Sequence, residues 1–120
     1  MLIAVTGGTG FLGTHTVAAL LRRGHRVRLL ARDPGRVPST VDVVTGDVTD
    51  PGAVARLVEG ADGLLHAAGV YTFDSRRRAE VWRVNVEGTA AVLDAARRAG
   101  TGRIVHVSTV GALFPTGAPS

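Results

Sequence analysis

The chain has 120 residues, of which 45% are apolar and 20% charged, a composition typical of one globular domain and not of a disordered chain. It has no cysteine, which excludes disulfides and thiolate metal sites, and no apolar run approaches the roughly 20 residues of a membrane span. All 14 basic residues are arginine and most are spread along the chain, so the net charge of +4 predicts a solvated surface, with neither nucleic acid nor membrane as a partner. We expect a cytoplasmic protein without a metal site.

The apolar pattern alternates between strand and helix periods along the whole chain. In chain order it predicts a strand at Leu2–Thr6, a helix over residues 10–23, a strand at Arg26–Ala31, a loop over residues 33–38 that holds a short helical turn, a strand at Val41–Thr45, a helix over residues 51–59, a strand at Gly63–Ala67, a helix over residues 75–99, a strand at Arg103–Val107 and an irregular tail over residues 111–120. Such βαβ units predict an α/β fold with a parallel sheet.

The long predicted helix carries one apolar face and one polar residue on it. Its inward positions are Val81, Val84, Gly88, Val92 and Ala95. Asn85 shares this face, so its amide must find hydrogen-bond partners. Trp82 is expected to pack, and His66 and His106, which lie within strands, are expected to be core or strand-end residues.

A glycine-rich turn joins the first strand to the first helix. Gly7, Gly10 and Gly13 recur at the spacing G-x-x-G-x-x-G. In such a turn one glycine adopts a positive φ, another lets the backbone approach a pyrophosphate, and the third lets the helix pack on its strand. The helix N-terminus then presents free N–H groups to the anion. This turn predicts a dinucleotide site.

Right-handed crossovers that begin at such a turn give the strand order 3-2-1-4-5. The ligand crevice then lies at the carboxyl ends of strands one and four. Small or polar residues follow all five predicted strands there: Thr6-Gly7, Arg32, Asp47-Val48, Ala68-Gly69 and Ser108-Thr109.

Five stretches together resemble a known family: residues 6–13, Gly46-Asp47-Val48, His66-Ala67-Ala68-Gly69, Asn85-Val86-Glu87-Gly88-Thr89 and Val107-Ser108-Thr109. They occur in the order found in extended short-chain dehydrogenases/reductases, which include sugar-nucleotide epimerases and dehydratases and the dihydroflavonol reductases. The chain resembles the N-terminal part of such a protein, a doubly wound Rossmann sheet that is incomplete at its C-terminus. The run Ala31-Arg32-Asp33-Pro34 leans toward the dihydroflavonol-reductase-like branch.

The resemblance implies a set of cofactor contacts. At the glycine turn these are Gly7, Gly10, Phe11, Leu12 and Gly13. The Asp47 carboxylate would accept from the adenine amine, and Val48 would supply backbone contacts. Ala67, Ala68 and Gly69 would lie against cofactor ribose, and Asn85 would support cofactor and active site. The residues alone also fit a turn-forming Asp47 before Thr49 and a purely structural Asn85.

The resemblance also implies where catalysis occurs. A Ser or Thr at the end of strand five would hydrogen-bond the reacting carbonyl or hydroxyl, a role that falls on Thr109 with Ser108 as second choice. The family's tyrosine, which is its general acid/base, and the lysine four residues on are absent. We therefore expect residues 1–120 to be a cofactor-binding fragment of a longer enzyme that shows no turnover by itself.

The end of strand two bears on the choice of cofactor. Ala31 stands where NAD-preferring Rossmann domains place an acid, and Arg32 beside it can clamp a 2′-phosphate. Asp33 is expected to begin the Pro34-Gly35 turn. The sequence thus predicts NADP(H) over NAD(H), in an oxidoreductase acting on a small carbonyl or hydroxyl substrate. A sugar-nucleotide epimerase or dehydratase, a non-catalytic dinucleotide sensor and a homodimer remain open.

Overall fold

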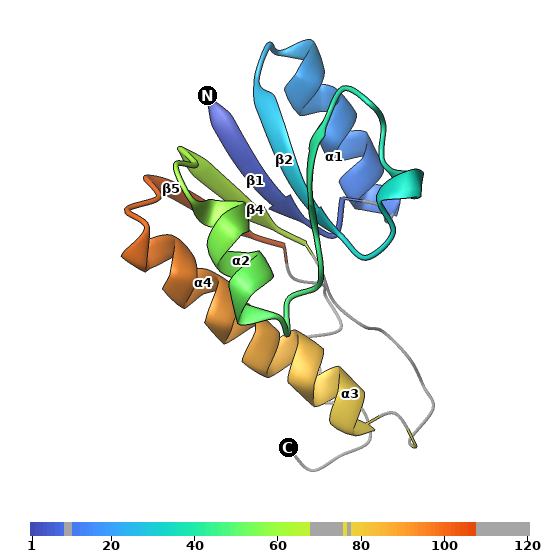
Figure 1. Ribbon diagram of the computed structural model, residues 1–120, viewed down its shortest axis with the longest axis vertical. Coiled ribbons are helices and arrows are strands. Elements are labelled where there is room, and N and C mark those ends of the chain that lie inside the picture. The colour runs from blue at the N-terminus through green and yellow to red at the C-terminus, as the bar shows by residue number, and fades with distance from the viewer. Residues whose placement is uncertain (9–10, 68–75, 77, 108–120) are drawn as a thin grey trace.

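The computed structural model describes residues 1–8, 11–67, 76 and 78–107. The strands there are β1 (Leu2–Thr6), β2 (Arg26–Ala31), β3 (Asp42–Thr45), β4 (Gly63–His66) and β5 (Arg103–His106). The helices are α1 (Phe11–Arg22), α2 (Pro51–Val58), α3 (Arg78–Trp82) and α4 (Thr89–Arg98), with the short turn η1 (Pro34–Arg36) and the π-helical segment η3 (Arg83–Gly88). The strands form one parallel sheet in the order β3-β2-β1-β4-β5, which confirms the predicted fold and strand order (Figure 1).

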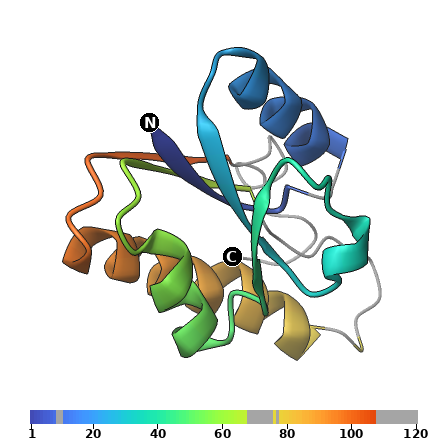
Figure 2. The ribbon, with the colours of Figure 1, turned by 45° about the horizontal axis from the view of Figure 1, so that its top comes forward.

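Helices cover both faces of this sheet. Figure 2 shows α1 on one face and α2, α3 and α4 on the other. Successive residues of a strand point to opposite faces, so Val5 packs on the α1 side while Ala4 packs on the side of α2 and α4. The central strands β1, β2 and β4 are buried on both faces, which is why they read as apolar runs, whereas all four residues of the edge strand β5 are exposed.

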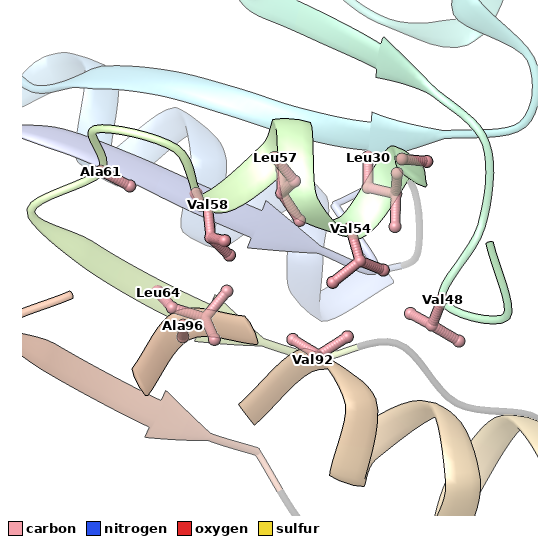
Figure 3. Packing of buried hydrophobic residues seen from close by; sticks show 11 residues of the cluster. Leu30, Val48, Val54, Leu57, Val58, Ala61, Leu64, Val92 and Ala96 are labelled. Carbon is pink, nitrogen blue, oxygen red and sulfur yellow. The ribbon is translucent and has the colours of Figure 1, made fainter. Parts of the chain in front are cut away.

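The larger core lies between the sheet and the pair α2 and α4. Figure 3 shows its side chains converging from the sheet, from both helices and from the loop after β3. Its most deeply buried members include Ala4, Ala53, Leu57, Val92 and Ala96. This core fixes α2 and α4 against the central strands, and it thereby positions the loops at the carboxyl ends of those strands.

Local signals in the sequence set the ends of the helices. Asp50 caps α2 by accepting hydrogen bonds from the N–H groups of Gly52 (3.1 Å) and Ala53 (3.3 Å), and Pro51 occupies the first helical position. Gly24 ends α1 with φ of 84°, the left-handed conformation that favours glycine. At the other end of α2, a guanidinium nitrogen of Arg28 donates to the carbonyls of Arg56, Leu57 and Glu59, at 3.2, 3.1 and 2.6 Å.

The long predicted helix differs from the observed chain. The structure divides it into α3, η3 and α4, with six residues in π-helical geometry. The inward positions Gly88 and Val92 are buried as predicted. Trp82 is 58% exposed, so its predicted packing is wrong; α3 holds no buried residue, and this ring lies on its outer side.

The predicted strand bounds hold to within one residue. β1 and β2 begin and end at the predicted residues, whereas Val41, Ala67 and Val107 lie just outside β3, β4 and β5. The predicted helical turn in the loop after β2 is η1.

Candidate dinucleotide site at the carboxyl ends of the strands

The carboxyl ends of β1 and β4 meet at the middle of the sheet. Thr6 and His66, the last residues of these strands, are partners in the parallel register. Both are fully buried. The N–H of Ala67 donates to the Thr6 carbonyl (3.2 Å) and to the Thr6 hydroxyl (3.1 Å), so the chain leaving β4 is tied to the start of the glycine turn. Ala67 therefore lies beside the turn, where a cofactor-binding residue was predicted.

Two glycines of the turn do what the sequence predicts of them. Gly7 adopts φ of 73°, the conformation that reverses the chain after β1. Gly13 lies against the turn so closely that a β-carbon there would be 1.9 Å from the Gly7 carbonyl oxygen. Helix α1 can therefore begin directly over the turn only because residue 13 has no side chain.

A third glycine, Gly8, has a packing role that the sequence analysis missed. A β-carbon at Gly8 would lie 2.1 Å from Cδ1 of Leu29 on β2. The turn is thus in close contact with the Leu29 side chain of β2 on one side and with Gly13 of α1 on the other. The second glycine of the predicted spacing, Gly10, lies outside the described residues.

Asp47 follows β3 and is half-buried. Its Oδ1 accepts hydrogen bonds from the Thr49 N–H (2.7 Å) and from the Thr49 hydroxyl. The bond from the Thr49 hydroxyl lowers the pKa of Asp47 most, and burial opposes it. The Thr49 N–H and the charges of Arg32 and Arg83 each lower this pKa by a smaller amount, and the net effect is a lowered pKa. The carboxylate is therefore ionised at neutral pH.

This geometry supports the turn-forming interpretation of Asp47 without removing the other. Oδ2 accepts no hydrogen bond from any residue that the structure describes. One oxygen thus holds the turn, and the second is free to accept from a ligand amine. Val48 next to it is buried, with its side chain against Gly88, so only its backbone can face a ligand.

Arg32 and Asp33, which follow β2, differ in whether their side chains form hydrogen bonds. The Asp33 carboxylate accepts from the N–H of Gly35 at 3.0 Å and caps η1, as predicted. Arg32 is exposed and makes no hydrogen bond or ion pair within the described part of the chain. Its charge nevertheless acts on Asp47, which places the guanidinium near the loop after β3.

The remaining predicted residues are brought together only in part. Asn85 is half-buried on η3. The backbone of Phe11 and Leu12 forms the first turn of α1. Ala68, Gly69, Ser108 and Thr109 lie outside the described residues, so the predicted ribose contacts and the catalytic hydroxyl stay predictions. Among the residues that the structure describes, no three His, Asp or Glu side chains lie close enough to hold a metal, and no helix has the length and apolar character to cross a bilayer.

The arrangement fits a dinucleotide. Gly13 packs on Gly7 and Gly8 without room for a β-carbon, so α1 begins close to the turn, as pyrophosphate binding at a helix N-terminus requires. The loops after β2 and β3 lie at the same edge of the sheet and carry the Arg32 guanidinium and the Asp47 carboxylate, groups of the kinds that recognise a ribose phosphate and an adenine amine.

Proteins from three bacteria are similar to this chain in sequence, and one of them, whose structure is solved, is also similar in fold. The putative dihydroflavonol 4-reductase of Synechocystis sp. is 39% identical over 91% of the chain and 33% of its own length. The ceramide reductase of Caulobacter vibrioides is 41% identical over 96% of the chain and 37% of its own length. A short-chain dehydrogenase/reductase superfamily protein from Agrobacterium tumefaciens, solved with bound NAD, is 34% identical with a TM-score of 0.86, over 99% of the chain and 35% of its own.

The chain spans about a third of the length of these curated relatives. The match to the description "NAD dependent epimerase/dehydratase family" extends over residues 3–120, which includes the glycine turn and all of the sheet except Leu2 of β1. The match covers nearly the whole chain, and the sheet has the strand order expected of a doubly wound Rossmann fold. The protein therefore belongs to the NAD dependent epimerase/dehydratase family of extended short-chain dehydrogenases/reductases.

Proposed function

We propose that the full-length protein is an NADP(H)-dependent oxidoreductase that interconverts a carbonyl and a hydroxyl group of a small substrate. The observation that carries this proposal is the contact of α1 with the glycine turn, where Gly13 leaves no room for a β-carbon against the Gly7 carbonyl. Such close packing sets the helix N-terminus over the turn and supports pyrophosphate binding there. The bound nicotinamide supplies or accepts the hydride.

The preference for NADP(H) rests on the end of β2. Ala31 is buried and has no polar side-chain atom, and the Asp33 carboxylate is engaged by the Gly35 N–H. Ala31 therefore cannot accept a hydrogen bond from the ribose hydroxyls, and the turn engages one oxygen of the Asp33 carboxylate, so the Asp33→Ala variant tests what the second oxygen does. Arg32 is exposed and free to pair with a 2′-phosphate by charge-assisted hydrogen bonds. The Agrobacterium relative was solved with NAD, so the choice needs a direct measurement.

Reduction is favoured over epimerisation by the relatives. Both curated relatives named above carry the word reductase in their names, at 39% and 41% identity. In the proposed enzyme Thr109, with Ser108 beside it, hydrogen-bonds the reacting oxygen. The proton would be moved by the family's tyrosine with its lysine, a Tyr-x-x-x-Lys pair that residues 1–120 do not contain.

Titration of the full-length protein with NADPH and with NADH tests the cofactor assignment. A charged hydrogen bond contributes roughly 1.5–3 kcal/mol, so we expect NADPH to bind about tenfold to a hundredfold more tightly. Arg32→Ala should remove this preference. Arg97→Ala, which removes an equal charge from the exposed last turn of α4, is the matched control and should leave it unchanged.

Two results would overturn the assignment. The first is equal affinity of the wild type for both cofactors, and the second is a preference for NADH that Asp33→Ala removes. Tight binding without oxidation of NADPH by any of a panel of aldehydes and ketones would favour the non-catalytic sensor instead.

A further inference from the structure

The imidazole of His66 joins the carboxyl end of β1 to the start of α4. Its Nδ1 lies 2.6 Å from the hydroxyl oxygen of Thr6, the last residue of β1. Its Nε2 lies 2.9 Å from the hydroxyl oxygen of Thr89, the first residue of α4. His66 and Thr6 are fully buried, so water does not compete for the bond between them, whereas the bond to Thr89 is partly buried. One side chain thus bridges two elements that the sheet alone does not connect.

The ring is neutral in the folded protein. Burial, and to a smaller extent the charge of His106, whose ring centroid lies 5.2 Å away, lower the pKa of His66 to about 4. A neutral imidazole has one N–H and one lone pair. We assign the ring N–H to Nε2, so that Nδ1 accepts from the Thr6 hydroxyl, which itself accepts the Ala67 N–H. Nε2–H then donates to Thr89, which gives both ring nitrogens a partner.

The two bonds end on different parts of the proposed site. Thr6 directly precedes Gly7, whose φ of 73° opens the glycine turn. Thr89 directly follows Gly88, which packs on Val48, and it stands four residues after Asn85. The Thr6 bond therefore acts on the turn that would hold the pyrophosphate, and the Thr89 bond acts on the start of α4, directly after the segment η3 that carries Asn85.

We propose that His66 is a positioning residue for the cofactor: its bond to Thr6 holds the glycine turn in the conformation that binds the dinucleotide, while its bond to Thr89 anchors α4. This inference rests on the proposed function. A residue that only filled the core would support both elements through its volume, so the identity of the lost hydrogen bond would not matter. A positioning role makes cofactor affinity depend on the Thr6 bond in particular.

Amide isosteres can separate the two bonds. An asparagine at position 66 can place Oδ1 near the position of Nδ1 and accept from Thr6, but it is too short to reach Thr89. A glutamine can place its amide N–H near the position of Nε2 and donate to Thr89, but it offers no acceptor at Nδ1. Each variant loses one hydrogen bond in the same buried place.

The experiment measures the Kd for NADPH and for NADH, by cofactor fluorescence, and the urea midpoint of the full-length protein and its variants. His66→Asn should keep the Kd within about threefold of wild type, and His66→Gln should raise it about tenfold or more, a ratio resolved by such titrations. Thr6→Val should match His66→Gln, whereas Thr89→Val should match His66→Asn. Thr6→Ser, which keeps the hydroxyl, should bind NADPH with the Kd of the wild type.

The outcomes distinguish this inference from the function on which it rests. If the wild type binds neither cofactor, the proposed function fails and the positioning role fails with it. If the wild type binds and the asparagine and glutamine variants lose affinity equally, or if the Kd follows the urea midpoint through the whole series, only the positioning role is wrong. The threonine variants give the same decision if the His66 variants do not fold.

Discussion

Replacing Gly13 with alanine places a methyl group where the backbone leaves no room. The new β-carbon would lie 1.9 Å from the Gly7 carbonyl oxygen, 2.7 Å from the Gly8 α-carbon and 2.8 Å from the Gly7 carbonyl carbon. These atoms belong to the backbone of the glycine turn, so no side chain can rotate away. Relief needs a displacement of about 1 Å between α1 and the turn, the difference between 1.9 Å and the 3.0 Å that real contacts respect. Overpacking of this kind costs about 1–3 kcal/mol of folding free energy.

The same displacement should affect cofactor binding more strongly than folding. The pyrophosphate site depends on N–H groups of the turn and of the first turn of α1, and these separate as α1 moves away. We expect the Kd for NADPH to rise about a hundredfold in Gly13→Ala, which corresponds to about 2.7 kcal/mol. Fluorescence titration of the full-length variant measures the Kd, and urea unfolding measures the stability separately.

Gly60→Ala is the matched control for this substitution. Gly60 adopts φ of 70° after α2, and a β-carbon there would meet no atom within 4 Å. Alanine at this position is strained by its backbone alone, which costs roughly 1–2 kcal/mol. It should lower stability comparably and leave the Kd unchanged. A Gly13→Ala protein that binds NADPH within threefold of wild type would refute the reasoning, as would an equal loss of affinity in Gly60→Ala.

Three further predictions concern stability. Arg28→Met removes the donor to three carbonyls at the end of α2 and should lower the free energy of unfolding in urea by about 1–3 kcal/mol. Arg26→Met, which breaks an exposed ion pair with Asp42, should lower it by under about 1 kcal/mol. Equal losses of stability in the two variants would contradict the capping role of Arg28. The pKa of His66 is lowered from 6.5 to about 4, so the unfolded chain takes up a proton in this interval and the folded chain does not: stability should be complete above pH 6.5 and fall by about 2–4 kcal/mol toward pH 4. His66→Asn should flatten this part of the stability profile, and an unchanged slope would assign it to other groups. Gly88→Ala places a β-carbon 2.6 Å from Cγ2 of Val48 and should lower the free energy of unfolding by about 1–3 kcal/mol. The double variant with Val48→Ala should recover much of this stability. Additive losses in the double variant would show that the two residues are not in steric contact.

The sheet could be predicted closely because its signals are local. β1 and β2 match their predicted bounds, and the Asp50-Pro51 signal marks the start of α2 correctly. The strand order followed from the glycine turn and from the handedness of crossovers, which leave few alternatives. These features depend on nearby residues and on general rules, and both are visible in a sequence.

The features that were missed depend on contacts between distant residues. Over six residues a π-helical segment has nearly the same apolar pattern as an α-helix, so nothing in the periodicity marks η3. The contact of Gly88 with Val48 joins positions 40 residues apart, and the bonds of His66 join β1, β4 and α4. His66 could be predicted as a core residue from its strand position, but its two partners could not. Trp82 fails for the same reason, since burial depends on what packs against a helix.

The central claim is that a dinucleotide binds at the carboxyl ends of β1 and β4, over the glycine turn. Backbone amide chemical shifts of the full-length protein, recorded by NMR with and without NADPH, test it directly. The largest changes are predicted at Gly7, Gly8 and Gly13, with a further change at Arg32 that NADH does not produce. Changes centred instead on the groove between α2 and α4, which Ala91 and Ala95 line, would contradict the claim.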